Sequence, residues 1–213
     1  MENTEAEYLA MLKDALPREF LGALLTSVVT AHRASLSQTK RQFDHPASRH
    51  NLLGYIRREK LNEEALALGE RFRIDAQMRP YGRGSGYYLL VSSKRIFLVI
   101  CVTRTRTTMV RPAEYRKILA RLNENTQQKF SFIPTDLHAD GEQFLCILIH
   151  GRRKGKDYPA FADIAFPHKT FQSWICRLNL FNEFPEIVNK LIVRRDAEAR
   201  PGHRKTQRKE RSA

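Results

Sequence analysis

The stretch FRIDAQMRPYGRGSGYYLLVSSKRIFLVICVTRTR, residues 72–106, decides the fold class of this 213-residue chain. It begins with alternating apolar and polar side chains, which is the pattern of a half-buried β-strand, with apolar positions at Phe72, Ile74, Ala76 and Met78. A glycine-rich loop, 79–86, leads into a second strand at 87–91. A third strand, 96–102, is apolar on both faces, which is typical of the centre of a sheet. The stretch therefore predicts three consecutive strands.

The residues before this stretch have helical periodicity. Apolar side chains recur every three or four positions, which predicts helices over 5–16 and 19–39. A third helix is expected from Asp44 through Ile56. Asn62 has the character of an N-cap, with glutamates after it, and predicts a separate fourth helix over 62–70.

The residues after this stretch mix both periods. We expect a helix over 112–125, strands over 144–149 and 161–166, a helix from Thr170 through Leu178 and a last helix after Pro185. From 194 onward no apolar periodicity remains, which predicts a disordered tail.

These expectations together define an α+β protein in three parts. Residues 1–70 are a helical segment. Residues 71–193 are a sheet domain with a basic face, in which a mixed sheet of order β-β-β-α-β-β is followed by C-terminal helices. Residues 194–213 are a disordered basic tail.

Positive charge is concentrated in one internal block. The whole chain has a formal net charge of +14. Residues 71–130 contain 13 basic and 3 acidic residues, a net charge of +10, whereas residues 1–70 have −1 and residues 131–193 have 0. The tail adds +5. A folded segment with this excess repels itself unless an anion is near, so the block indicates a polyanionic partner.

Basic and aromatic residues occur together in and after this block. Arginine binds phosphates, and tyrosine can stack on an unpaired base. Strand alternation should place Arg104 and Arg106 on the same side of the sheet. Of the neighbours Tyr87 and Tyr88, the same alternation should bury one. The predicted nucleic-acid contacts are Arg79, Tyr81, Arg83, Arg104, Arg106, Arg111, Arg116, Lys117, Arg121, Arg152, Arg153 and Lys154.

The expected order helix-β-β-β-α-β resembles the core of the restriction-endonuclease-like nucleases, in element order alone. Those enzymes carry an Asp on the second or third strand, followed by Glu-x-Lys or Asp-x-Lys, to hold Mg²⁺ and assist the attacking water. Neither strand has a carboxylate here, and the chain contains no Glu-x-Lys or Asp-x-Lys. A nuclease-like core would therefore be a degenerate, binding version. The remaining catalytic candidates are Asp75, Asp163 and His150, with Asp163 expected on the solvent side of its strand.

Other classes of function lack their signatures. The three cysteines have no CxxC spacing and read as core residues, which fits a reducing cytoplasm. The longest apolar run, 96–102, is too short to span a bilayer, and the acidic N-terminus is not a signal peptide. The histidines show no metal-ligand spacing, and neither glycine-rich loop is a nucleotide fingerprint, so we expect no metal and no cofactor.

The sequence leaves three hypotheses. The first is a non-catalytic nucleic-acid-binding protein that uses the basic, Tyr- and Arg-bearing sheet face, with the helices of residues 1–70 available to a protein partner. The choice between DNA and RNA stays open, although the glycine-rich Tyr/Arg loop favours single strands or distorted duplexes. The second is a divergent metal-dependent nuclease. The third is a module whose basic face binds an acidic protein.

Overall fold

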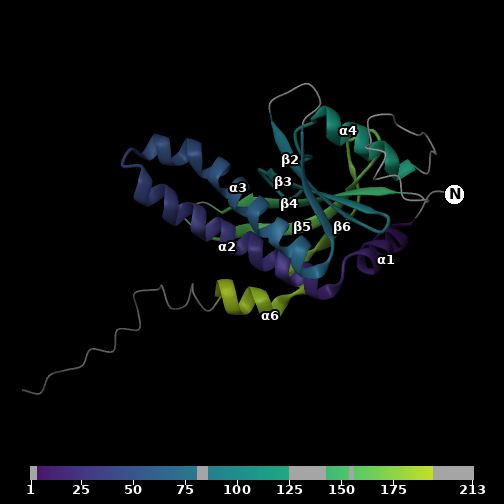
Figure 1. Ribbon diagram of the computed structural model, residues 1–213. Coiled ribbons are helices and arrows are strands. Elements are labelled where there is room, and N and C mark those ends of the chain that lie inside the picture. The colour runs from purple at the N-terminus through teal and green to yellow at the C-terminus, as the bar shows by residue number, and fades with distance from the viewer. Residues whose placement is uncertain (1–3, 81–85, 125–142, 154–155, 194–213) are drawn as a thin grey trace, which may run out of the picture.

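A computed structural model describes residues 4–80, 86–124, 143–153 and 156–193 of the chain (Figure 1). The strands are β1 (Asp75–Pro80), β2 (Tyr87–Ser93), β3 (Ile96–Thr103), β4 (Phe144–Arg152), β5 (Pro159–Pro167) and β6 (Trp174–Asn179). The helices are α1 (Glu5–Ala15), α2 (Arg18–Gln42), α3 (Pro46–Phe72), α4 (Glu114–Ala120), α5 (Leu180–Glu183) and α6 (Pro185–Val188), with short helical turns at Arg121–Glu124 and Asn189–Val193.

The strands form one mixed sheet in sequence order, β1-β2-β3-β4-β5-β6. Every neighbouring pair is antiparallel except β3 and β4, which run parallel because the chain returns through α4 between them. The predicted α+β class and the mixed sheet are confirmed. No helix in the described ranges is both long and apolar enough to cross a bilayer.

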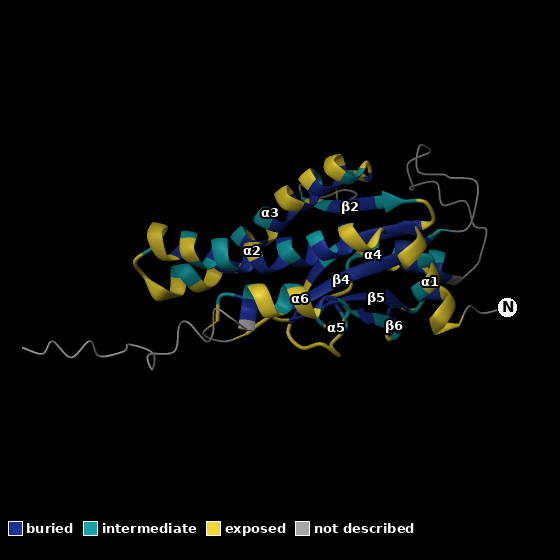
Figure 2. Cartoon of the chain, turned by 90° about the horizontal axis from the view of Figure 1, so that it is seen from below, coloured by how far each residue is buried: buried dark blue, intermediate teal, exposed yellow. Residues whose placement is uncertain are grey.

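Helices cover both faces of the sheet, so the fold has three layers (Figure 1). The larger core lies between one face and α1, α2 and α3, where Leu12, Phe20 and Leu61 meet Leu98 and Ile164. The smaller core lies between the other face and α4, together with the chain that precedes it. We call these the α2 face and the α4 face. In Figure 2 the central strands are buried over most of their length, while the far end of the α2–α3 hairpin has many exposed residues.

Residues 46–72 form one continuous helix, so the prediction of two helices separated at Asn62 was wrong. Asn62 lies buried inside α3 instead of at a cap. Pro46 stands in the first turn of α3 and no other proline occurs up to Phe72, so no proline forces a break within the helix. The glutamates that follow Asn62 are compatible with a helix interior as well as with a first turn.

The helix predicted from Thr170 is also wrong, because residues 174–179 form the edge strand β6. The segment pairs antiparallel with β5, with Leu178 opposite Ile164 and Trp174 opposite Pro167. Phe171 has a positive φ of 58°, which interrupts any helix that starts at Thr170. Cys176 and Leu178 lie in the core on the α2 face, and this is the period-two pattern of a strand.

Candidate nucleic-acid interface

The parallel pairing of β3 and β4 brings two distant basic segments to one edge of the sheet. Thr103 is the register partner of Gly151, so Arg104 and Arg152 follow directly at neighbouring strand ends. β1 runs in the same direction as β3, because each is antiparallel to β2, and it ends with Arg79 and Pro80. We call this group of Arg79, Arg104, Arg152 and Arg153 the basic edge. Neighbouring strands lie about 4.8 Å apart, so the edge spans roughly 15 Å from β1 to β4.

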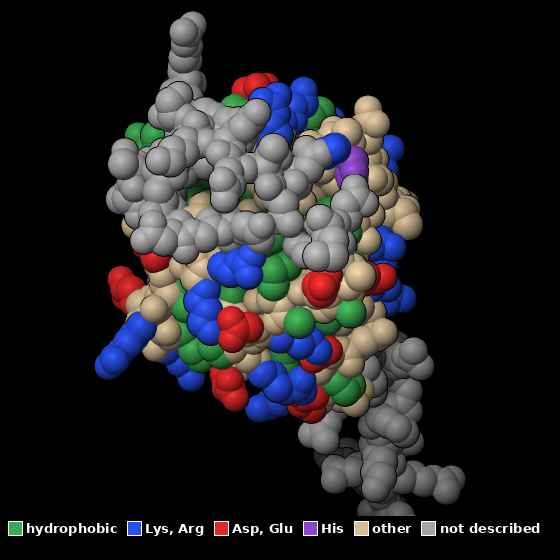
Figure 3. Space-filling model, turned by 90° about the vertical axis from the view of Figure 1, so that its right-hand side faces the viewer, with side chains coloured by type: hydrophobic (Ala, Val, Ile, Leu, Met, Phe, Trp, Pro, Cys, Tyr) green, Lys and Arg blue, Asp and Glu red, His purple; other side chains and the backbone are tan. Residues whose placement is uncertain are grey.

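The arginines next to the parallel pair have no carboxylate partner in the described part of the chain. Within the described ranges, none of Arg104, Arg152 and Arg153 forms an ion pair with a carboxylate. Helix α1 marks the opposite end of the sheet, since Tyr8 packs on Phe144 and Phe166. At that end Lys or Arg side chains lie next to Asp or Glu side chains (Figure 3). The two ends of the sheet therefore differ in charge pattern.

A second group of predicted contacts lies at α4, on the α4 face. Arg111, Lys117 and Arg121 are exposed there. Arg116 is half-buried, with Nη1 2.9 Å from Sγ of Cys101 and its guanidinium over the ring of Tyr115. Burial raises the pKa of Cys101, and the charge and hydrogen bond of Arg116, which favour the thiolate, offset only part of that rise.

The two neighbouring tyrosines differ in exposure as alternation predicts, although Tyr88 is half-buried and not fully buried. Tyr88 stacks on Tyr115 of α4, with ring centroids 4.0 Å apart and planes 21° from parallel. Tyr87 points to the other face and is 57% exposed. Since both start β2, next to the basic edge, Tyr87 presents an exposed aromatic ring beside it.

Strand alternation, on which the prediction for Arg104 and Arg106 depends, does not apply to these two residues. Strand β3 ends at Thr103, and both arginines lie in the bent segment that follows. Arg106 turns to the α4 face and binds Asp163 with two hydrogen bonds, Nε to Oδ2 at 2.5 Å and Nη2 to Oδ1 at 2.8 Å. Asp163 is fully buried, so its predicted solvent-facing position was wrong. The arginine supplies the partner that a carboxylate needs inside a core.

The three catalytic candidates are not brought together. Asp75 is exposed at the start of edge strand β1, where Gln77 donates a hydrogen bond to it. Asp163 pairs in register with Ile149 on the α4 face, whereas His150 pairs with Ala162 on the α2 face. No group of three or more potential metal ligands occurs in the part of the chain that the structure describes. The described residues thus give no joint acid, base or metal-binding geometry for these three.

A buried basic cluster escaped the sequence analysis. Nε2 of His32, on α2, lies 2.9 Å from Nδ1 of His150, on β4. Burial lowers the pKa of His150 to about 3, with the charge of Arg57 as a second cause. Burial also lowers the pKa of His32 strongly, and the neighbouring His150 and Arg57 lower it further. One signal was present in the sequence: Arg57 is a lone charge on the otherwise apolar stripe Leu53, Leu61 and Ala65 of α3.

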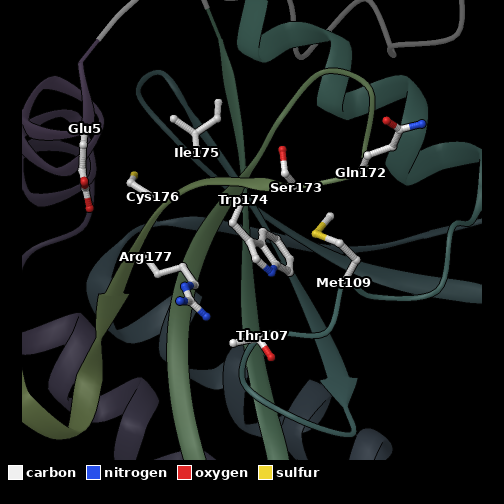
Figure 4. Close-up of a pocket in the computed structure, with 9 residues that line it drawn as sticks. All are labelled: Glu5, Thr107, Met109, Gln172, Ser173, Trp174, Ile175, Cys176 and Arg177. Carbon is white, nitrogen blue, oxygen red and sulfur yellow. The ribbon is translucent and has the colours of Figure 1, made fainter.

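A pocket of about 480 Å³ lies against the edge strand β6 (Figure 4). Trp174, Met109, Thr107 and Arg177 line it. Arg177 donates a hydrogen bond to the carbonyl oxygen of Arg106, so the pocket adjoins the Arg106–Asp163 pair. None of the predicted contacts that the structure describes, and so no residue of the basic edge, lines this pocket.

Four expectations fall where the structure makes no statement. Tyr81, Arg83, Lys154 and the tail 194–213 lie outside the described residues. The geometry of the basic edge therefore rests on Arg79, Arg104, Arg152 and Arg153 alone. No protein-family model, curated protein or solved structure matches this chain, so the argument for its function comes from its own residues.

Proposed function

We propose that this protein binds nucleic acid through the basic edge and does not catalyse a reaction on it. The observation that carries the proposal is the parallel β3–β4 pair, which sets Arg104 beside Arg152 and Arg153 with no described carboxylate paired to any of them. Adjacent guanidinium groups repel one another, and phosphates of a polyanion would offset that repulsion. The exposed ring of Tyr87 next to this edge adds a surface for an unpaired base.

The order of the elements supports a degenerate restriction-endonuclease-like core as the frame of this interface. The described elements follow the order α3-β1-β2-β3-α4-β4-β5. Strands β2 and β3 contain no carboxylate, and Asp163 is engaged by Arg106. A binding function therefore agrees better with these residues than the divergent nuclease does.

Oligonucleotide binding by the intact chain tests the proposal. Fluorescence anisotropy at several salt concentrations gives the affinity and its salt dependence for single-stranded and double-stranded oligonucleotides. The double substitution Arg104→Ala with Arg153→Ala should weaken binding. It should also flatten the slope of log affinity against log salt by about one to two units, since each phosphate contact contributes roughly 0.7 to 0.9.

A matched control removes the same charge at the other end of the sheet. Lys13 and Lys94 are exposed and pair with Glu183 and Asp14. Replacing both by alanine should leave the salt slope within about half a unit of the parent, because they lie away from the basic edge. Equal effects of the two double substitutions would mean that only total charge matters, and the proposed interface would be wrong.

Two further outcomes decide between the remaining hypotheses. Cleavage of the oligonucleotide with Mg²⁺ or Mn²⁺, abolished by EDTA, would favour the divergent nuclease. If the intact chain binds no oligonucleotide even at low salt, the proposal fails and the basic edge is assigned to an acidic protein partner.

A further inference from the structure

Arg57 is a buried charge that no described residue pairs with. It lies in the middle of α3 on the stripe that faces inward, and only 4% of it is exposed. Its Nε is buried without a hydrogen-bond partner, and the guanidinium forms no ion pair within the described ranges. An uncompensated charge inside a protein destabilises the fold by several kcal/mol. A ligand of opposite charge would remove that penalty.

The polar groups around Arg57 are cationic or neutral. Burial lowers the pKa of Arg57 to about 10, and repulsion by the positive charge of Arg152 adds to this shift. Nη1 of Arg152 lies 3.3 Å from Nδ1 of His50, at the start of α3. Behind Arg57 stand His32 and His150, both neutral because burial lowers their pKa values. The cluster therefore offers two positive charges and further N–H groups, and it repels metal cations.

Solvent reaches the cluster at the end of β4. Arg152 and His50 are exposed, and Val102, the register partner of His150, is about half exposed. Arg57, on α3, is thus the buried member of this group, and Arg152, at the end of β4, is an exposed one. An anion that enters here would meet the fixed N–H fork of an arginine that is already oriented by packing.

We propose that Arg57 and Arg152 form an oxyanion site between α3 and the end of β4, and that its ligand is a phosphoryl group. Arginine forks match the oxygen geometry of phosphates, and the double negative charge of a phosphate monoester balances the two guanidinium groups. The inference rests on the proposed function only for the identity of the molecule that carries the phosphoryl group. The phosphoryl group belongs either to nucleic acid bound at the basic edge or to a small phosphorylated molecule.

Thermal unfolding of the intact protein with inorganic phosphate tests the site directly. Sodium chloride at equal ionic strength is the reference. A phosphate concentration ten times Kd should raise Tm by about 3 to 6 °C. The substitution Arg57→Met should abolish this rise, and in chloride the variant should unfold at a temperature equal to or above that of the parent, because a buried charge has been removed.

Arg58→Met is the matched control. Arg58 follows Arg57 on the exposed side of α3 and pairs with Glu59. This variant should keep the full response to phosphate. If phosphate raises the Tm of the parent no more than it raises the Tm of Arg57→Met, the oxyanion site is disproved. Should Arg57→Met fail to fold, Arg152→Met replaces it, since Arg152 is exposed, and a full phosphate response in that variant would equally overturn the site.

Oligonucleotide binding then identifies the carrier and separates this inference from the proposed function. If phosphate stabilises the parent and Arg57→Met also weakens oligonucleotide binding at least fivefold, the phosphoryl group of nucleic acid occupies the site. If phosphate stabilises the parent but Arg57→Met binds oligonucleotides as the parent does, the oxyanion site holds for a small phosphorylated molecule. Binding of oligonucleotides without any phosphate response leaves the proposed function standing and removes the site.

Discussion

Arg106 and Asp163 tie the segment after β3 to the middle of β5. The carboxylate is fully buried on the α4 face and accepts hydrogen bonds from Nε and Nη2 of the arginine, whose side chain stays partly exposed. The same bond explains why the chain bends after Thr103 instead of continuing as a strand. Asp163 raises the pKa of Arg106, chiefly through this hydrogen bond.

Loss of the arginine should therefore destabilise the fold more than loss of both partners. Arg106→Met leaves the carboxylate of Asp163 buried without its partner and should lower the free energy of unfolding by about 3 kcal/mol. Adding Asp163→Leu should recover most of that loss, because the buried charge is removed as well. Urea unfolding of the parent, both single variants and the double variant measures the coupling. Additive losses would show that the two side chains do not stabilise each other.

Two glycines of α3 should respond oppositely to alanine. A Cβ at Gly54 would meet nothing within 4 Å, so Gly54→Ala should stabilise the protein by about 0.5 to 1 kcal/mol through helix propensity. At Gly69 a Cβ would lie 2.6 Å from Cβ of Ala76 and 2.8 Å from the carbonyl oxygen of Ile74, so Gly69→Ala should destabilise it. Thermal unfolding measures both. A gain at Gly69 would contradict the close packing of α3 on β1.

Local pattern predicted the first five strands, β1 to β5, because each of them alternates or is largely apolar. It failed where the deciding interaction is long-range. Phe171 and the pairing with β5 make residues 174–179 a strand, although their spacing also fits a helix. The sequence predicted two helices within residues 46–72, because Asn62 suits an N-cap as well as a helix interior.

The candidate site, too, could be predicted from the sequence only in part. The charge excess of residues 71–130 was visible in the sequence, but the meeting of Arg104 with Arg152 depends on the parallel register of β3 and β4. The buried position of Asp163 could not be predicted from its strand alone, because an acidic side chain on a strand is expected to face solvent. Its partner, Arg106, lies 57 residues away in the sequence. Arg57 was detectable only as a charge on an apolar helix stripe.

Tyr87 should contribute to binding and not to stability. Its ring is exposed at the start of β2, so Tyr87→Ala should leave Tm nearly unchanged. If a base stacks on it, affinity for a single-stranded oligonucleotide should fall by about 1 to 3 kcal/mol, with a smaller loss for a duplex. Tyr55, exposed to the same extent on α3, is the control and should have no effect. Equal losses from both variants would argue against stacking at Tyr87.

The buried pair of His32 and His150 should make stability depend on pH below neutrality. Their pKa values in the folded protein lie below the ordinary 6.5, to about 3 for His150, and burial is the main cause. The folded state keeps them neutral, whereas the unfolded chain binds their protons as the pH falls below 6.5. The stabilisation is therefore present above pH 6.5 and is lost towards pH 3, at about 1.4 kcal/mol per pH unit for each histidine.

Urea unfolding between pH 6.5 and pH 5 measures this loss in a range above most carboxylate titrations. The neighbouring Arg57, whose pKa is lowered only to about 10, remains cationic in this range and opposes protonation of both histidines. His150→Asn should remove about half of the slope, because one of the two titrating groups is gone. His168→Asn, in the loop after β5, is the control and should keep the parent slope. A parent whose stability does not fall over this range would show that the two histidines are not held neutral by burial.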